Sequence, residues 1–313
     1  MPFERILGNR AAHERLGALV TRNRVAHAFL FAGPAGIGKR MAALEFAKLL
    51  LGGSEADVRQ VDAGHHPNLR LLARIEDKRE IVVDQMRELL RELSMKTASP
   101  QRRIVLVDEA ERLNEEAQNA FLKTLEEPPH RCIIILVTAS PALLLPTIVS
   151  RCQMVLFTPL APAEMSEFMK TLQLGASEAA LVLALADGLP GRASQLAPEI
   201  GELASRAKEL LERLAAGDLN SIIEEVAKIR DTESARERAR EELTITALAL
   251  REALRHRELG ESLNLCPPAL LKRLEPVDSE AIAERIELVL EHQRFIDQYA
   301  NVPLTVEDAL LRV

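Results

Sequence analysis

The sequence AFLFAGPAGIGKR, residues 28–40, joins a predicted strand to a predicted helix through a glycine-rich turn. The apolar run at 28–31 predicts a buried strand, and apolar side chains three and four positions apart over 40–51 predict a helix. A GxxxxGK run between a strand and a helix is typical of a phosphate-binding loop. The loop residues Gly33, Gly36 and Gly38 would let the backbone wrap a phosphate, and Lys39 would neutralise its outer oxygens.

The residue after this lysine departs from the pattern. A phosphate loop normally continues with a serine or threonine, whose hydroxyl ligates Mg²⁺, but here the next residue is Arg40. A guanidinium has no acceptor lone pair, so it cannot ligate a cation. We therefore expect an intact phosphate-loop fold with impaired metal-dependent hydrolysis. Whether ATP or ADP binds without being hydrolysed stays open.

An acidic pair follows a second apolar run, Ile104-Val105-Leu106-Val107. Asp108 would hold Mg²⁺ and Glu109 would polarise an attacking water if this strand end is a Walker B motif. Two acids can also simply solubilise a strand end. With Arg40 in the chain, the pair can instead persist as a structural partner for that arginine.

Further apolar runs alternate with helical patterns up to about residue 160. Such alternation predicts a parallel sheet with helices on both faces. Asn114 is expected to cap one of the helices, with two glutamates in its first turn. A proline-containing segment at 158–162 then marks a boundary, beyond which the chain is almost entirely helical. The predicted strands are 69–73, 104–107, 132–137 and 155–157, and the predicted helices include 83–93, 236–257 and 279–299.

Composition limits the function further. The formal net charge of -7 argues against a protein that coats nucleic acid through bulk charge, although a local basic patch remains compatible with it. The three cysteines form no CxxC pair, and the adjacent His65 and His66 fit a polar loop better than a shared metal ion, so we expect no metal site. With no apolar signal segment and no membrane-spanning run, a cytoplasmic location is expected.

Several strings resemble one family. AHAFLF at 26–31, FLKTLEEPP at 121–129 and PTIVSRCQ at 146–153 are similar to the AAA+ subunits of bacterial DNA polymerase III clamp loaders, and ANVPL at 300–304 is similar to the C-terminal part of the delta-prime type. The resemblance covers most of the chain and is strongest up to about residue 160. It implies an AAA+ nucleotide-binding-like domain at 1–160, a helical lid at 161–203 and a helical collar at 204–313.

Two types within that family must be separated, delta-prime and the ATP-hydrolysing gamma/tau. Arg40 in place of the loop hydroxyl favours delta-prime, as does the absence of a long additional tail. The four-cysteine zinc module of the family is also absent, which counts equally against both types. The alternatives are a gamma/tau-like or other AAA+ ATPase, a helicase-loading or repair protein that binds DNA directly, and a scaffold.

The resemblance also implies roles for particular residues. Arg151, in the SRC motif, would act in trans on the phosphate bound at a neighbouring subunit, unless it forms only a salt bridge at the start of a strand. Thr138 matches the sensor-1 position and Arg192 lies near the sensor-2 position. The implied partners are the delta and gamma/tau subunits, with the β sliding clamp and primed DNA reached through the complex. The chain would serve as a relatively rigid stator.

Overall fold

The computed structural model describes residues 3, 6–75, 80–94, 102–218, 233–260, 266–297 and 301–312. The chain divides into two compact units. Residues 1–168 and 188–191 form the first unit, and residues 169–187 and 192–313 form the second. The expected separation of the helical part into a lid at 161–203 and a collar at 204–313 stays a prediction.

The first unit is built around five parallel strands in the order β2-β3-β4-β1-β5. The predicted strands are confirmed to within two residues at their ends. Because all strands run the same way, the loops that follow them gather at one edge of the sheet and the loops that precede them at the other. The strands are β1 (Ala28–Ala32), β2 (Leu69–Leu72), β3 (Arg103–Val107), β4 (Cys132–Thr138) and β5 (Gln153–Leu156).

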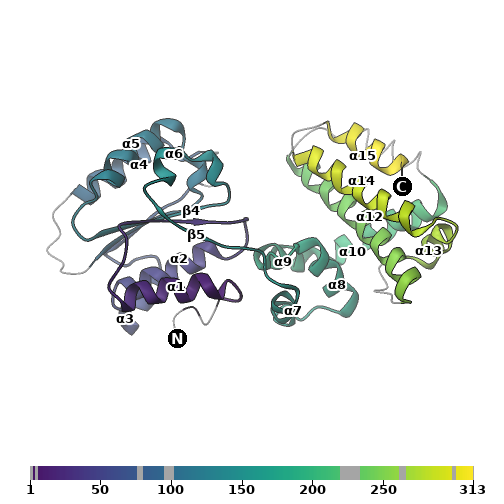
Figure 1. The fold of residues 1–313 in the computed structure, drawn as a ribbon, viewed down its shortest axis with the longest axis horizontal. Coiled ribbons are helices and arrows are strands. Elements are labelled where there is room, and N and C mark those ends of the chain that lie inside the picture. Colours follow the sequence, from purple (N-terminus) through teal and green to yellow (C-terminus); the bar gives the residue numbers. More distant parts are fainter. Residues whose placement is uncertain are drawn as a thin grey trace. The chain divides into compact units, whose positions relative to one another are not determined.

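Helices cover both faces of this sheet, as the continuous apolar strands predict (Figure 1). One face carries α1 (Arg10–Thr21), α2 (Lys39–Leu50) and α3 (Glu55–Asp62), and the other carries α4 (Val83–Ser94), α5 (Glu115–Glu126) and α6 (Pro146–Val149). The chain therefore has the predicted α/β architecture of a P-loop domain.

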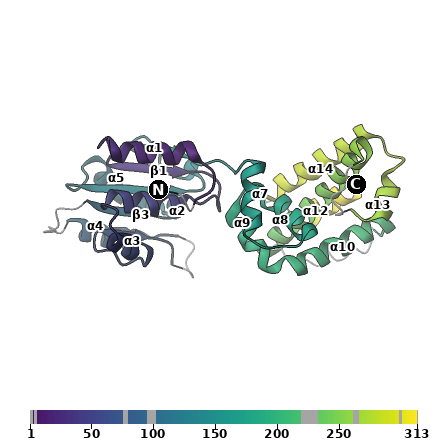
Figure 2. The same ribbon diagram turned by 90° about the horizontal axis from the view of Figure 1, so that it is seen from below.

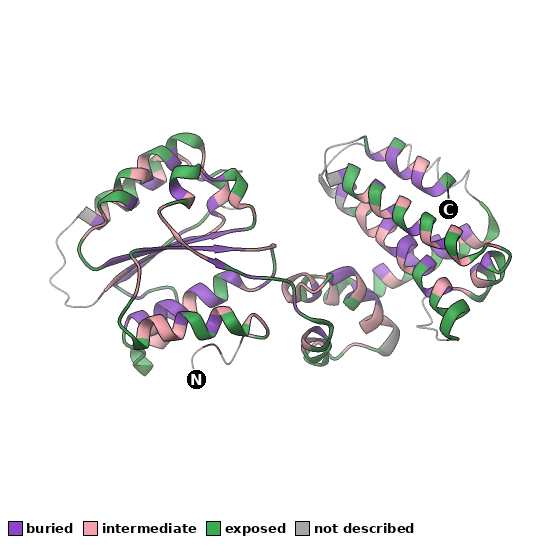
Figure 3. Ribbon diagram, viewed as in Figure 1, coloured by how far each residue is buried: buried purple, intermediate pink, exposed green. Residues whose placement is uncertain are grey.

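The side chains of β1 point alternately to the two faces of the sheet, and each set is buried against the helices on its own face. Leu30 belongs to the cluster that Phe121 of α5 and Ile134 of β4 also join. Phe29 packs edge-on against Phe46 of α2, with 5.1 Å between ring centroids. Successive strand side chains point to opposite faces, so an all-apolar strand needs a helical layer on each side. The buried residues lie along the inner faces of these layers (Figure 3).

The second unit is helical. Its two longest helices, α12 (Glu233–Leu259) and α14 (Ser279–Asp297), pack side by side (Figure 2). They are antiparallel, because Arg236 near the start of α12 donates to the carbonyl of Ile296 at the end of α14. Leu243, Ala247 and Leu250 of α12 are buried, so this apolar stripe serves an internal core. Tyr299, at the end of the predicted helix 279–299, lies outside the described residues.

The remaining helices of the described residues are shorter than these two. Among the described residues no helix is long and apolar enough to cross a bilayer. The other helices are α7 (Pro162–Lys170), α8 (Ala176–Ala186), α9 (Pro190–Leu196), α10 (Ile200–Ala216), α13 (Pro268–Leu274) and α15 (Val302–Leu311).

Candidate functional site

The glycine-rich loop leaves β1 at the carboxyl edge of the sheet and enters α2. Gly33, Gly36 and Gly38 have φ angles of 154°, 77° and 94°, a region that glycine occupies without the steric cost other residues meet. Gly33 is also tightly packed, since a Cβ there would lie 2.2 Å from the carbonyl oxygen of Phe157. The backbone of this loop thus requires its glycines.

Lys39, the first residue of α2, turns back over the loop. Its side chain is buried, and Nζ donates to the carbonyl oxygens of Gly33 at 2.6 Å and Pro34 at 2.7 Å. Burial lowers the pKa of Lys39, while the nearby carboxylates of Glu111 and Asp108 oppose that shift. The ammonium group is held at the loop, where a phosphate would compete with the two carbonyls for its protons.

Arg40 reaches across to the acidic strand end. Its Nη1 lies 3.2 Å from Oδ2 of Asp108, and the two side chains are 56% and 16% exposed. Burial raises the pKa of Asp108, and the Arg40 guanidinium opposes this shift. The structure therefore brings Arg40 and Asp108 together in the arrangement expected of a structural partnership. A role of Asp108 in holding Mg²⁺ stays a prediction.

A second arginine, Arg74, forms an ion pair with Glu109, the other acid after β3. Nε of Arg74 lies 3.2 Å from Oε2 of Glu109, whose backbone has φ 47°. Arg74 was not predicted as a site residue. Its place two residues beyond β2 is the only signal the sequence offered, because loops after neighbouring parallel strands meet at one edge.

Thr138 ends β4 at the same edge and is fully buried. Its carbonyl oxygen accepts the Gly33 N–H at 3.3 Å, and its Oγ1 accepts the Ser140 N–H at 3.1 Å. Glu111 lies beside it, with Oε1 accepting the Ala139 N–H at 3.1 Å, and sequence reasoning missed this residue. The hydroxyl of Thr138 thus supports the turn after β4, and its sensor role stays a prediction.

The segment Gly188–Gly191 belongs to the first unit and contacts the loop directly. The N–H of Gly191 donates to the carbonyl of Gly36 at 2.8 Å, and a Cβ on Gly191 would lie 2.7 Å from that oxygen. Arg192, the next residue, belongs to the second unit, and its assignment as sensor 2 stays a prediction.

The residues of this site fit a phosphate better than a divalent cation. The loop offers backbone amides and a lysine, but position 40 carries no hydroxyl, and both acids of the pair are held by arginines. Among the described residues no group of three or more His, Cys, Asp and Glu side chains is arranged to hold a metal ion. His66 instead accepts the Asn68 N–H at Nδ1, and its Nε2 lies 3.3 Å from Asp57.

Arg151 lies at the opposite edge of the sheet. It precedes β5, whose first residue Gln153 pairs with Phe29, and Gly33 lies four residues beyond Phe29, or about 13 Å along the strand at roughly 3.3 Å per residue. Arg151 donates to the carbonyl of Thr147 at 3.0 Å and pairs with Glu126 at 2.6 Å. The structure thus joins two of the quoted strings, FLKTLEEPP and PTIVSRCQ, through an ion pair. A salt bridge of Arg151 was one of the two alternatives in the sequence analysis, but its partner Glu126 was not identified there.

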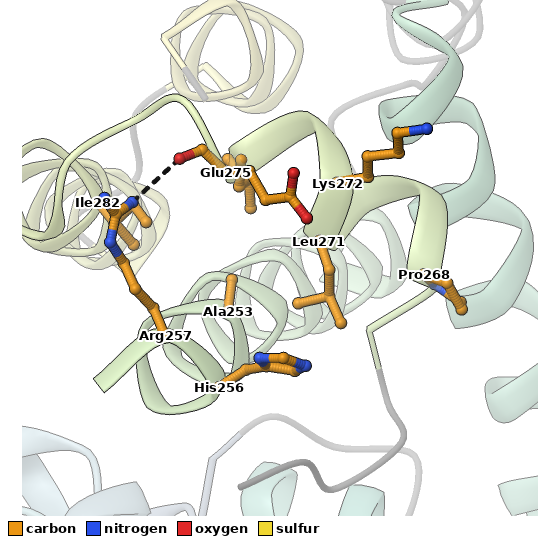
Figure 4. Close-up of a pocket in the computed structure, with 9 residues that line it drawn as sticks. Ala253, His256, Arg257, Pro268, Leu271, Lys272, Glu275 and Ile282 are labelled. Carbon is orange, nitrogen blue, oxygen red and sulfur yellow. Dashed lines mark hydrogen bonds between the residues drawn. The ribbon is translucent and has the colours of Figure 1, made fainter. Parts of the chain in front are cut away.

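The second unit contains a pocket of about 320 Å³ where the end of α12 meets α13 and the start of α14 (Figure 4). Arg257 lies at its side and donates to the carbonyls of Glu275, at 3.3 Å, and Val277. These bonds tie the end of α12 to the turn between α13 and α14. None of the site residues predicted from the sequence lines this pocket.

The parallel sheet, the glycine loop after β1 and the acidic pair after β3 define a P-loop protein of the AAA+ type. The family model described as "DNA polymerase III, delta subunit" matches residues 8–161. The delta-prime subunit of Escherichia coli DNA polymerase III is 30% identical over 264 residues, which span 81% of this chain and 75% of the relative. The chain therefore belongs to the delta-prime family of DNA polymerase III clamp-loader subunits.

Other relatives match over shorter regions. The delta-prime subunit of Pseudomonas aeruginosa is 36% identical over 61% of this chain, and the tau subunit of Bacillus subtilis is 31% identical over 48%. The matched regions span 58% and 28% of those two relatives. A gamma-subunit-related protein of DNA polymerase III from Thermotoga maritima has a similar structure, with a TM-score of 0.44, 21% identity, and coverage of 95% of this chain and 97% of that one.

Proposed function

We propose that this chain is a stator of the clamp loader that supplies Arg151 in trans to a nucleotide bound on a neighbouring gamma/tau subunit. Together with the delta and gamma/tau subunits it would help to place the β sliding clamp on primed DNA during replication. In this proposal the chain itself does not hydrolyse ATP. Its family membership supports the replication role. The placement of its glycine loop and of Arg151 at opposite edges of the sheet supports an action of Arg151 on a neighbouring subunit.

The observation that carries the proposal is the position of Arg151. It lies at the amino edge of the sheet, whereas the chain's own loop lies at the carboxyl edge. Side chains cannot bridge the length of a strand, so Arg151 does not serve the loop of its own chain. A third of its side chain, 35%, is exposed. An arginine in that position suits a phosphate presented by another subunit.

Arg151 can leave its present partner at small cost. Glu126 is 52% exposed, and exposed ion pairs contribute about 0–1 kcal/mol to stability. A phosphate offers oxygen acceptors that match the forked guanidinium, which stays charged at every physiological pH. The developing charge of phosphoryl transfer would strengthen that contact.

The chain's own loop supports a non-hydrolysing role. It lacks the metal-ligating hydroxyl, and Asp108 and Glu109 are each paired with an arginine. Phosphoryl transfer in P-loop proteins depends on a cation held by such a hydroxyl and acid. Here Arg40 takes the place of the hydroxyl and pairs with Asp108, and Arg74 pairs with Glu109.

The test is reconstitution with gamma/tau and delta subunits, followed by measurement of DNA- and clamp-stimulated ATP hydrolysis. We expect Arg151→Ala to lower the stimulated rate by about 10³-fold or more, the range of trans-acting arginines. Arg70→Ala is the matched control, because Arg70 also forms a half-exposed ion pair, 2.7 Å from Glu92. Full hydrolysis by the complex that contains Arg151→Ala would remove the trans-acting role.

A gamma/tau-like ATPase is the second candidate, favoured by the match to the tau subunit of Bacillus subtilis. It predicts turnover by the isolated chain that depends on Lys39 and is stimulated by DNA. The stator proposal predicts no such turnover.

A further inference from the structure

The two carboxylates after β3 are each held by an arginine from another element. Arg40 of α2 lies 3.2 Å from Asp108, and Arg74, beyond β2, lies 3.2 Å from Glu109. The four residues converge at the carboxyl edge of the sheet, next to the glycine loop. A cation that used either acid would have to displace an arginine first.

The local charge is already balanced without a dication. Lys39, Arg40 and Arg74 bring three positive groups to this edge, and the carboxylates of Asp108, Glu109 and Glu111 lie beside them. The loop position that normally supplies a hydroxyl ligand supplies the Arg40 guanidinium, which cannot ligate a metal. The site therefore lacks the free oxygen ligands that Mg²⁺ requires.

The phosphate-binding part of the site is retained. The positive φ angles of Gly33, Gly36 and Gly38 form the loop, and α2, a helix of 12 residues, begins directly after it. The side chain of Lys39 lies over the loop. The side chain of Arg40 is 56% exposed, so the Arg40 guanidinium can turn toward a ligand and still remain near Asp108.

We infer that this loop is a metal-independent site, in which a nucleoside di- or triphosphate is neutralised by Lys39 and Arg40 and Mg²⁺ has no place. Arg40 supplies the charge that a cation supplies in hydrolysing P-loop proteins. This inference goes beyond the stator role of Arg151 and does not rest on it.

The test is calorimetric titration of the full chain with ADP, once with EDTA and once with excess MgCl₂. We expect dissociation constants that agree within about twofold, because no interaction worth a larger factor depends on the metal. Binding that requires Mg²⁺ would overturn the inference, and so would the absence of binding in both buffers.

Variants at position 40 sharpen the test. Arg40→Thr should weaken binding in EDTA about tenfold, the effect of losing one charge-assisted contact. Mg²⁺ should restore part of that loss. Arg40→Lys keeps the charge and should keep metal-independent binding, which distinguishes a charge effect from misfolding. Arg87→Thr is the matched control, since Arg87 pairs with Asp84 on the exposed side of α4.

Unchanged binding by Arg40→Thr in EDTA would contradict the assigned role of Arg40. These titrations use the isolated chain and the Arg151 experiment uses the assembled complex. The two tests are therefore independent, and a negative result in one does not contradict the other proposal.

Discussion

Gly33 shows how a single residue fixes the loop after β1. Its φ of 154° and the 2.2 Å approach of a Cβ to the Phe157 carbonyl leave no room for a side chain. The opposing atom is backbone, which cannot rotate away. The loop can therefore pack directly against the backbone of Phe157 only because residue 33 has no side chain.

Gly33→Ala should lower the free energy of unfolding of the first unit by about 2–4 kcal/mol, because the strand end must shift to admit the methyl group. Gly17→Ala is the control. Gly17 lies inside α1 with nothing within 4 Å of a Cβ, so alanine there should raise stability by about 0.5–1 kcal/mol. Urea denaturation followed by circular dichroism measures both, and equal midpoints for the two variants would contradict this account.

Gln118 is a second residue on which the first unit depends. Its buried side chain donates to the carbonyls of Leu113 and Leu143 and accepts the N–H of Leu145. It thereby ties α5 to the chain that follows β4.

Gln118→Leu should lower the free energy of unfolding by about 2–4 kcal/mol, since three backbone groups lose their partner. Asn119→Leu, at the exposed neighbouring position, should change stability by less than about 0.5 kcal/mol. Thermal melts compare the two. Similar losses for both variants would show that the hydrogen bonds of Gln118 are not the cause.

At the scale of elements, α15 is fastened to α14 by a polar contact. His292 of α14 is buried, with Nδ1 2.8 Å from the carbonyl of Leu288 and Nε2 2.7 Å from Oδ2 of Asp308 on α15. The hydrogen bond from His292, followed by contacts with Arg312, lowers the pKa of Asp308 below its usual 3.8. The carboxylate form of Asp308 is thus the form that the folded state favours.

Asp308→Asn should therefore destabilise the second unit near neutral pH and have less effect in acid. A lowered folded-state pKa gives stability that is present above pH 3.8 and is lost as the pH falls through the folded value. Melting temperatures of wild type and variant measured at pH 7 and at pH 3 should converge at the lower pH. A difference that persists unchanged at pH 3 would assign the effect to packing.

Local patterns predicted the elements themselves. Asn114 was expected to cap a helix, and its side chain accepts the Ala117 N–H at 2.9 Å at the start of α5. Glycine spacing likewise predicted the loop before α2. Such signals lie within a few residues of one another, so the sequence carries them directly.

Pairs distant in the sequence were not predictable in this way. Arg74 and Glu109 are 35 residues apart, and Glu126 and Arg151 are 25 apart. Parallel sheet topology brings each pair to a common edge, and exposed arginines have many acidic neighbours to choose from. The motifs therefore located the loop, the SRC arginine and Asp108 as a candidate partner of Arg40, while Arg74 and Glu126 had to come from the structure.

At the scale of the whole molecule, the first unit has two edges with different chemistry. The carboxyl edge carries a phosphate loop whose acids are paired with arginines, and the amino edge carries Arg151, one third exposed. Under the stator proposal, the chain influences hydrolysis only on a neighbouring subunit. Its second unit, built around α12 and α14, has a hydrophobic core of its own.

The most direct test of this account is the ATP hydrolysis rate of the purified chain, measured alone and after mixing with gamma/tau and delta subunits, primed DNA and the β clamp. We predict no turnover by the chain alone. We also predict that hydrolysis by the other subunits rises when this chain is added. Turnover by the chain alone at about 1 s⁻¹ or faster, the usual range of enzymes, or hydrolysis by the mixture that is indifferent to its presence, would contradict the account.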